Sequence, residues 1–145
     1  MGLEHQVAEQ LSKELQLELG GKFEVGADMT VDDFQQLGSL GSRIDLVVRS
    51  VSGDGEPLFL IELKTGKSPY EVPYSVLNSF KLWKTARSAR DAVLVLATTR
   101  KIGSLLRGEL SSQGVQVVES SSIERLVSEL TKLIRSRGPG ARSDA

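Results

Sequence analysis

Three charged residues interrupt two otherwise apolar segments of this chain. Asp45 lies in the segment 44–49, and Glu62 and Lys64 lie in the segment 58–64, where Ile, Leu, Val and Phe dominate. Such segments are typical of buried strands, in which a carboxylate is costly unless it is paired or bound to a cation. Carboxylates that hold a divalent cation can activate a water molecule and stabilise a leaving oxygen, which is the chemistry of phosphodiester hydrolysis.

The turn between the two segments predicts that the three charges lie together. A Gly-Asp-Gly sequence at 53–55 is typical of a hairpin. Depending on where the turn is centred, Asp45 lies opposite Glu62 or opposite Lys64. Opposed residues share a face, and so do residues two apart on one strand. The three side chains therefore share a face in either register, whereas a slip of one residue would separate them.

At these residues the chain resembles the PD-(D/E)XK nuclease superfamily, which includes many restriction endonucleases and Holliday-junction resolvases. The family pattern is an Asp on one strand followed by Glu-x-Lys on the next, and it reads here as Asp45 and as Glu62-Leu63-Lys64. Ile44 occupies the place of the family's Pro, which is a common departure. The resemblance covers about residues 1–100.

The resemblance implies an Mg²⁺- or Mn²⁺-dependent nuclease, and we expect a DNA endonuclease. It implies that Asp45, Glu62, the Leu63 carbonyl and Glu4 hold the metal, and these are the oxygen ligands that Mg²⁺ prefers. It assigns Lys64 to the attacking water or to transition-state charge, and pairing with the carboxylates is the alternative role. The catalytic residues that it implies are Asp45, Glu62, Lys64 and Glu4.

Glu4 is chosen among the acids of the first expected helix because of its neighbours. Val7, Ala8 and Leu11 follow it at helical offsets, so Glu4 borders the apolar stripe, whereas Glu9 faces solvent. Nucleases of this superfamily often place a first-helix Glu near the metal, and the resemblance carries that role over to Glu4. The alternative is a first-turn glutamate that interacts favourably with the helix dipole.

The hydrophobic pattern predicts an α/β domain. We expect helices at 3–19, 72–89 and 102–112, a last helix capped by residues 120–122, a short helical turn at 34–37, and strands at 22–25, 44–49, 58–64, 92–97 and 115–118. The order α-β-β-β-α-β-α-β-α predicts a mixed central sheet with helices on both faces. It matches the restriction endonuclease-like αβββαβ core with an extra C-terminal strand and helix. We expect one nuclease domain over 1–136 and a disordered tail over 137–145.

The composition excludes several classes of protein. The chain has 145 residues and a net charge of −1, so it is suited to one domain and is not a generally basic nucleic-acid-binding protein. Without cysteine it can form neither a disulfide nor a thiolate zinc site. The longest apolar run, 92–97, is too short to span a membrane, and no signal peptide is recognisable. We therefore expect a cytoplasmic protein without a membrane partner.

Positive charge is nevertheless concentrated in residues 81–107. This segment carries one acidic residue, Asp91. Its basic residues are Lys81, Lys84, Arg87, Arg90, Arg100, Lys101 and Arg107. A basic face can engage phosphates, and a solvated helix face is the alternative. We expect Arg100 and Lys101, together with Arg43 and Lys67, to contact nucleic acid, although Lys67 as a plain exposed loop lysine is an alternative.

Two other functions are compatible with the sequence. A catalytically inactive nuclease-fold module for nucleic-acid binding or protein assembly would keep the basic face, but the intact Asp45, Glu62 and Lys64 argue against loss of catalysis. An α/β interaction domain unrelated to nucleases would hold the same charges as a buried ion network. A chain of 145 residues leaves little room for a sequence-reading domain. We therefore expect structure-selective cleavage or a separate targeting partner, and a homodimer would allow both strands to be cut.

Overall fold

A computed structural model of the chain describes residues 3–29, 44–51, 57–65, 71–85 and 91–137. Within these ranges the elements are α1 (Leu3–Leu19), the short 3-10 helix η1 (Gly20–Lys22), β1 (Phe23–Met29), β2 (Ile44–Ser50), β3 (Pro57–Lys64), α3 (Val76–Trp83), β4 (Val93–Thr98), α4 (Ser104–Ser112), β5 (Gln116–Glu119) and α5 (Ile123–Arg137). Their order confirms the predicted order of helices and strands.

The strands form one mixed sheet in the order β1-β2-β3-β4-β5. β1 pairs with β2, and β2 with β3, in antiparallel fashion. β3 pairs with β4, and β4 with β5, in parallel fashion. The hairpin-rich first half and the alternating second half of the sequence therefore meet at β3, which confirms the predicted α/β class with a mixed central sheet.

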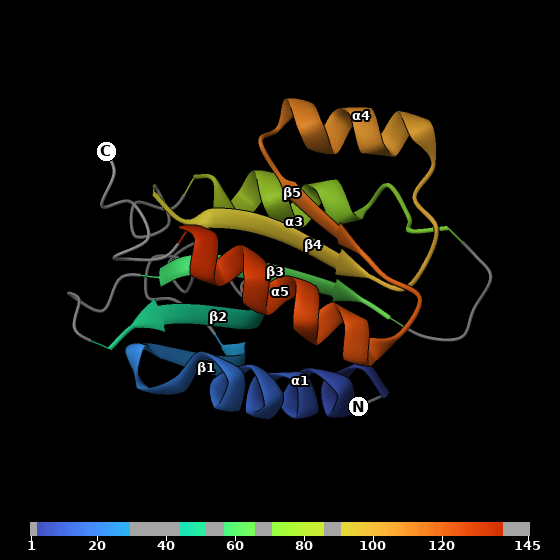
Figure 1. The fold of residues 1–145 in the computed structure, drawn as a ribbon. Coiled ribbons are helices and arrows are strands. Elements are labelled where there is room, and N and C mark those ends of the chain that lie inside the picture. Colours follow the sequence, from blue (N-terminus) through green and yellow to red (C-terminus); the bar gives the residue numbers. More distant parts are fainter. Residues whose placement is uncertain (1–2, 30–43, 52–56, 66–70, 86–90, 138–145) are drawn as a thin grey trace.

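Helices cover both faces of this sheet, so the molecule has three layers (Figure 1). On one face α3 and α4 pack through Val76, Leu77, Phe80, Trp83, Leu106 and Leu110 against Val47, Leu60, Leu94 and Leu96 of the sheet. On the other face α1 and α5 pack through Ala8, Leu11, Leu15, Leu19, Leu126, Val127, Leu130 and Ile134 against Leu46, Val48, Phe59, Ile61, Leu63, Val95 and Ala97. The alternation of apolar residues along each strand supplies one set to each face.

The helix ends follow from local sequence. Ser122 caps α5, because its hydroxyl oxygen accepts a hydrogen bond of 3.2 Å from the Arg125 N–H. Gly20 follows α1 with a φ of 74°, and Gly114 follows α4 with a φ of 79°. Both angles lie in the left-handed region that glycine adopts without a steric penalty, which ends each helix.

Two predicted boundaries were wrong. The helix expected from Val72 begins at Val76, because Pro73 disfavours helical backbone at the preceding residue and the Val72 N–H donates instead to the Lys101 carbonyl at 2.9 Å. The strand expected at 22–25 runs from Phe23 to Met29, because it pairs with β2 along this whole length.

Several predictions fall on residues that the structure does not describe. They are the helical turn at 34–37, the Gly-Asp-Gly turn at 53–55, the end of the helix expected to reach residue 89, and the predicted tail 137–145 apart from Arg137, which ends α5 as a helical residue. Each stays a prediction. None of the helices in the described ranges is long and apolar enough to cross a membrane.

Candidate active site

The sheet opens at one end between β2 and β3. β2 stays paired with β1 as far as Ile44, which lies opposite Met29. The pairing of β2 with β3 stops earlier, at Leu46 opposite Ile61. β3 in turn stays paired with β4 as far as its last residue, Lys64. The two strands therefore separate at their common end and form a fork, with β2 on one arm and β3 on the other.

The predicted acidic residues lie on the two arms of this fork. The observed register pairs Leu46 with Ile61 and Val47 with Leu60. Continued by one residue, it brings Asp45 opposite Glu62, which is the first of the two predicted registers. Asp45 therefore lies on the β2 arm and Glu62 on the β3 arm.

The Asp45 carboxylate reaches across the fork to the backbone of β3. Its Oδ2 atom accepts a hydrogen bond of 2.8 Å from the Leu63 N–H. The carboxylate thus takes the place of a main-chain acceptor where the strands part. In an extended strand the N–H and C=O of one residue point to the same side. The Leu63 carbonyl therefore also points from β3 toward the β2 arm.

Glu62 and Lys64 are neighbours on the face of β3 that α3 covers. Strand residues two apart share a face, so both side chains lie on the same face as Leu60, which packs in the core beneath α3. The Lys64 Nζ atom lies 3.6 Å from the Glu62 Oε2 atom, and the two side chains are 24% and 14% exposed. This distance exceeds that of a good hydrogen bond, so the ion pair is loose. Both side chains are largely shielded but remain reachable by water.

The oxygen atoms gathered here suit a hard divalent cation. Asp45 and Glu62 supply carboxylates, and Leu63 supplies a carbonyl on the same side as Asp45. Mg²⁺ and Mn²⁺ favour such ligands, and Mg²⁺ usually keeps several water molecules beside one or two carboxylates. Among the described side chains, no group of three His, Cys, Asp or Glu residues comes together. The donor set fits Mg²⁺ by ligand type, with two carboxylates.

Glu4 was the third carboxylate expected at the metal. Its backbone belongs to the first turn of α1, and Figure 1 shows the start of α1 at the same end of the sheet as the carboxyl ends of β3 and β4. Its side chain lies outside the described part of the structure, as do Arg43 and Lys67. Their expected roles stay predictions.

Thr98 joins the end of β3 to the segment after β4, and the sequence analysis did not select it. Its side chain is fully buried, and its Oγ1 donates to the Lys64 carbonyl at 2.7 Å. The same atom accepts a hydrogen bond of 2.8 Å from the Arg100 N–H. The sequence feature that could have identified Thr98 is its polar side chain directly after the apolar run 92–97.

The described basic residues of the segment 81–107 lie at both ends of β4, and their expected contact with nucleic acid stays a prediction. Arg100 and Lys101 follow the carboxyl end of β4, at the fork. Lys84 lies at the amino end of β4, where its Nζ donates to the carbonyl and side-chain oxygens of Gln113 at 3.0 and 3.3 Å. Arg107 pairs instead with Glu119 at 2.6 Å. A strand of this length spans about 20 Å, so Lys84 cannot act on the same phosphate as Arg100 and Lys101.

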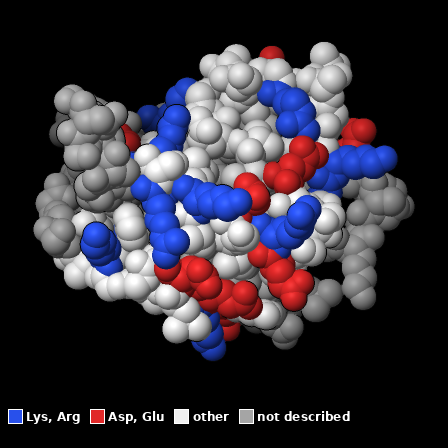
Figure 2. Space-filling view, viewed as in Figure 1, with Lys and Arg blue, Asp and Glu red and all other residues white. Residues whose placement is uncertain are grey.

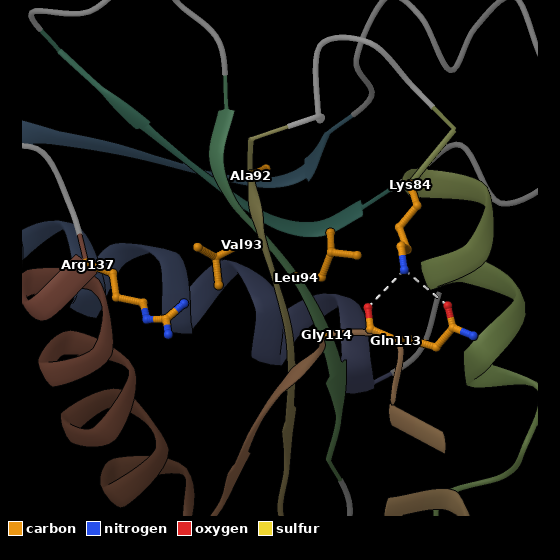
Figure 3. A pocket seen from close by; sticks show the side chains of 7 residues that line it. All are labelled: Lys84, Ala92, Val93, Leu94, Gln113, Gly114 and Arg137. Atoms are coloured by element: carbon orange, nitrogen blue, oxygen red, sulfur yellow. Dashed lines mark hydrogen bonds between the residues drawn. The ribbon is translucent and has the colours of Figure 1, made fainter. Parts of the chain in front are cut away.

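A shallow cavity marks the amino end of β4 (Figure 3). Its volume is about 290 Å³, and it is lined by Lys84, Ala92, Val93, Leu94, Gln113, Gly114 and Arg137. On the face covered by α1 and α5, side chains of both signs are interspersed (Figure 2). The cavity at the amino end of β4 has no carboxylate in its lining. On the face of α1 and α5, Glu14, Glu18 and Glu124 line a second cavity, and Lys132 and Arg135 line the same cavity and can balance their charge. The fork, which carries the residues of the predicted motif, is therefore the candidate active site.

Comparison with known proteins supports the fold. No protein-family model and no curated protein matches the chain. The crystal structure of a protein of unknown function, AF1548, is similar with a TM-score of 0.62 and 17% identity, over 89% of this chain and 67% of that one. The crystal structure of VC1899 from Vibrio cholerae is similar with a TM-score of 0.63 and 14% identity, over 92% of this chain and 34% of that one.

A restriction endonuclease is also among the structural neighbours. The structure of MspJI in complex with a 27-mer oligonucleotide has a TM-score of 0.47 and 15% identity, over 96% of this chain and 29% of that one. The chain thus spans about a third of the length of VC1899 and of MspJI. The similarity to MspJI is too weak to carry a functional argument, and the other two similarities establish the α/β fold alone.

Proposed function

We propose that this protein is a metal-dependent nuclease that hydrolyses phosphodiester bonds of DNA as an endonuclease. The observation that carries the proposal is the fork between β2 and β3. It brings Asp45 opposite Glu62 and sets Lys64 next to Glu62. Two carboxylates and an amine at the open end of a sheet match the arrangement that the sequence motif implies.

Asp45, Glu62 and the Leu63 carbonyl would hold Mg²⁺ or Mn²⁺, with Glu4 as a proposed fourth ligand. The bound ion would lower the pKa of a coordinated water and neutralise charge on the leaving oxygen. The Leu63 N–H fixes the Asp45 carboxylate at the mouth of the fork. This bond reduces the cost of ordering the ligand when the ion arrives.

Lys64 is proposed to act on the attacking water or on the negative charge of the transition state. Its partial exposure, 24%, leaves the ammonium accessible to water and substrate. Its contact with Glu62 keeps it beside the metal ligands. The ammonium offers three donors and can bind both a water and a phosphate oxygen.

Nucleic acid would be held by basic residues around the fork. Arg100 and Lys101 follow β4 at this end of the sheet, and Arg43 and Lys67 flank the motif in the sequence. We propose that these four residues contact phosphates, which fix the position of the substrate without reading its bases. A separate targeting partner would then supply the choice of cleavage site, and a homodimer would allow both strands to be cut.

A catalytically inactive nucleic-acid-binding module is the second candidate. The Lys64–Glu62 contact favours it, because an ammonium can balance a carboxylate without any metal. The two candidates differ in whether the fork binds a divalent cation.

Cleavage assays separate them. Labelled duplex, branched and single-stranded DNA, and RNA, are incubated with Mg²⁺, Mn²⁺ or EDTA. Cleavage of DNA that requires metal and disappears in Asp45→Asn supports the nuclease. Glu129→Gln, which neutralises an exposed carboxylate on α5, serves as the matched control. Metal-independent cleavage, or none in any condition, contradicts the proposal.

A further inference from the structure

We propose that the buried hydroxyl of Thr98 is a positioning group that holds Arg100 beside Lys64, so that the Arg100 guanidinium binds a substrate phosphate next to the lysine. The inference rests on the proposed function of the fork. It adds Thr98 to the site and gives Arg100 one partner, a phosphate of the nucleic-acid backbone.

Thr98 uses its hydroxyl to join two backbone segments. Its side chain is 0% exposed, and its Oγ1 donates to the Lys64 carbonyl and accepts from the Arg100 N–H. A hydroxyl has one proton to donate and two acceptor sites, so one atom satisfies both groups. A valine of the same shape would leave the Arg100 N–H without this acceptor, and buried unpaired groups are costly.

The sheet register places this link at the catalytic lysine. Thr98 lies opposite Lys64 in the parallel pair of β3 and β4, so the two side chains project from the same face of adjacent strands. The Thr99 N–H also donates to the Lys64 carbonyl, at 3.2 Å. The last residue of β3 and the first residues after β4 thus form one rigid unit, which Arg100 continues.

The Arg100 side chain lacks one partner in this unit. Its Nε atom is shielded from solvent and has no hydrogen-bond partner in the structure as far as it is described. A shielded polar group of this kind is rare, and a charged one is the most costly. The Nε–H and a terminal N–H of a guanidinium form a fork that matches two oxygens of a phosphate. Arg100 as a whole is only partly buried, so a substrate phosphate that turns its guanidinium outward would satisfy the Nε–H.

The proposed contact also bears on specificity. A guanidinium that binds a phosphate reads charge and backbone geometry and carries no base information. Arg100 should therefore strengthen binding to any DNA sequence to the same extent.

The test compares two buried threonines. Thr98→Val removes the hydroxyl at the fork, and Thr98→Ser retains it. Thr131→Val removes a second buried hydroxyl, which lies away from the fork and donates to the Val127 carbonyl within α5. Single-turnover cleavage of a short labelled duplex DNA with Mg²⁺ is measured well below the melting temperature of each variant. We expect Thr98→Val to lower the cleavage rate about tenfold, the scale of a lost hydrogen bond, with recovery to within about threefold of wild type in Thr98→Ser.

A second measurement does not depend on cleavage. Binding of the same duplex is followed by fluorescence anisotropy in EDTA for wild type, Thr98→Val, Arg100→Met and the double variant. We expect Arg100→Met to weaken binding about tenfold, with Thr98→Val causing no further loss in the Arg100→Met background. Such non-additivity is the signature of two residues that act as one unit.

The outcomes separate this inference from the proposed function. An unchanged cleavage rate in Thr98→Val, an equal loss in Thr131→Val, or a Thr98→Ser variant as impaired as Thr98→Val overturns the positioning role. If wild type binds DNA but never cleaves it, the nuclease proposal fails. In that case, non-additive losses of binding in the Thr98→Val and Arg100→Met variants still support the inference, and additive losses overturn it. Absence of DNA binding by wild type overturns both.

Discussion

The two ends of β4 both carry basic side chains, but they hold them in different surroundings. At the amino end, Lys84 donates to two oxygens of the neutral Gln113, and Arg137 lies across the cavity from it (Figure 3). At the carboxyl end, the Thr98 hydroxyl binds the backbone of Arg100, whose Nε atom has no partner in the described structure.

This difference shows why the number of basic residues is a poor guide to function. The exposed Lys84 is satisfied by the carbonyl and amide oxygens of Gln113, so its surroundings require no ligand. The fork instead carries two carboxylates on neighbouring strands, Asp45 and Glu62, which are ligands that a divalent cation favours. It also leaves a guanidinium N–H that an anion would satisfy. Divalent metal and phosphate are the two ligands that we propose for this end of the sheet.

The largest effect is expected when a carboxylate at the fork is compared with one at the amino end of β4. Asp45→Asn should lower metal-dependent cleavage about 10³-fold or more, because it removes a proposed metal ligand. Asp91→Asn, which neutralises an exposed carboxylate just before β4, should leave cleavage unchanged. Single-turnover rates with Mg²⁺ provide the comparison. Retained cleavage in Asp45→Asn would remove the fork as the active site.

Lys64 and Lys84 form the second pair. If Lys64 acts on water or on transition-state charge, Lys64→Met should fold, bind metal and lose cleavage on the order of 10²-fold. If it only balances Glu62, the variant should melt at a lower temperature instead. Lys84→Met should change neither property by a comparable amount. Calorimetric metal titration beside the cleavage assay distinguishes the two roles, and full activity in Lys64→Met would exclude the lysine from the mechanism.

Metal binding should also appear as a change in stability. Because a ligand that binds only the native state stabilises it by mass action, millimolar Mg²⁺ or Mn²⁺ should raise the melting temperature of wild type by about 5 °C. Asp91→Asn should show the same rise and Asp45→Asn should show none. A melting temperature that metal leaves unchanged in all three proteins would argue for the inactive module.

The smallest effect concerns the salt dependence of DNA binding. Replacing Arg100 and Lys101 by Met should reduce the slope of log affinity against log salt by about one for each lost phosphate contact. Replacing Lys84 and Arg137, at the other end of β4, should leave the slope as in wild type. Fluorescence anisotropy over a range of salt concentrations gives both slopes. Equal reductions in the two double variants would mean that DNA binding is not confined to the fork.

Much of the fold was predictable from local pattern. The predicted helix at 3–19 coincides with α1, because Leu11 and Leu15 recur at helical spacing and Gly20 ends the helix with a positive φ. The apolar run 92–97 indicated an interior strand, and β4 is paired on both sides. The apolar residues alone misplaced the start of α3. Pro73 was a local signal against helix at Val72, and the hydrogen bond from Val72 to the distant Lys101, which holds that segment outside the helix, could not be read from the sequence.

By itself, the sequence determined which residue types are available for chemistry and which strands carry them. Which residues of β2 and β3 share a face follows from their spacing in the sequence, so Asp45, Glu62 and Lys64 could be grouped before any fold was known. Tertiary structure alone decided the register, the opening of the fork and the link through Thr98. The register and the fork depend on where the backbone hydrogen bonds between β2 and β3 begin and end, and the link depends on a hydrogen bond between residues 34 positions apart. Side-chain pattern encodes neither.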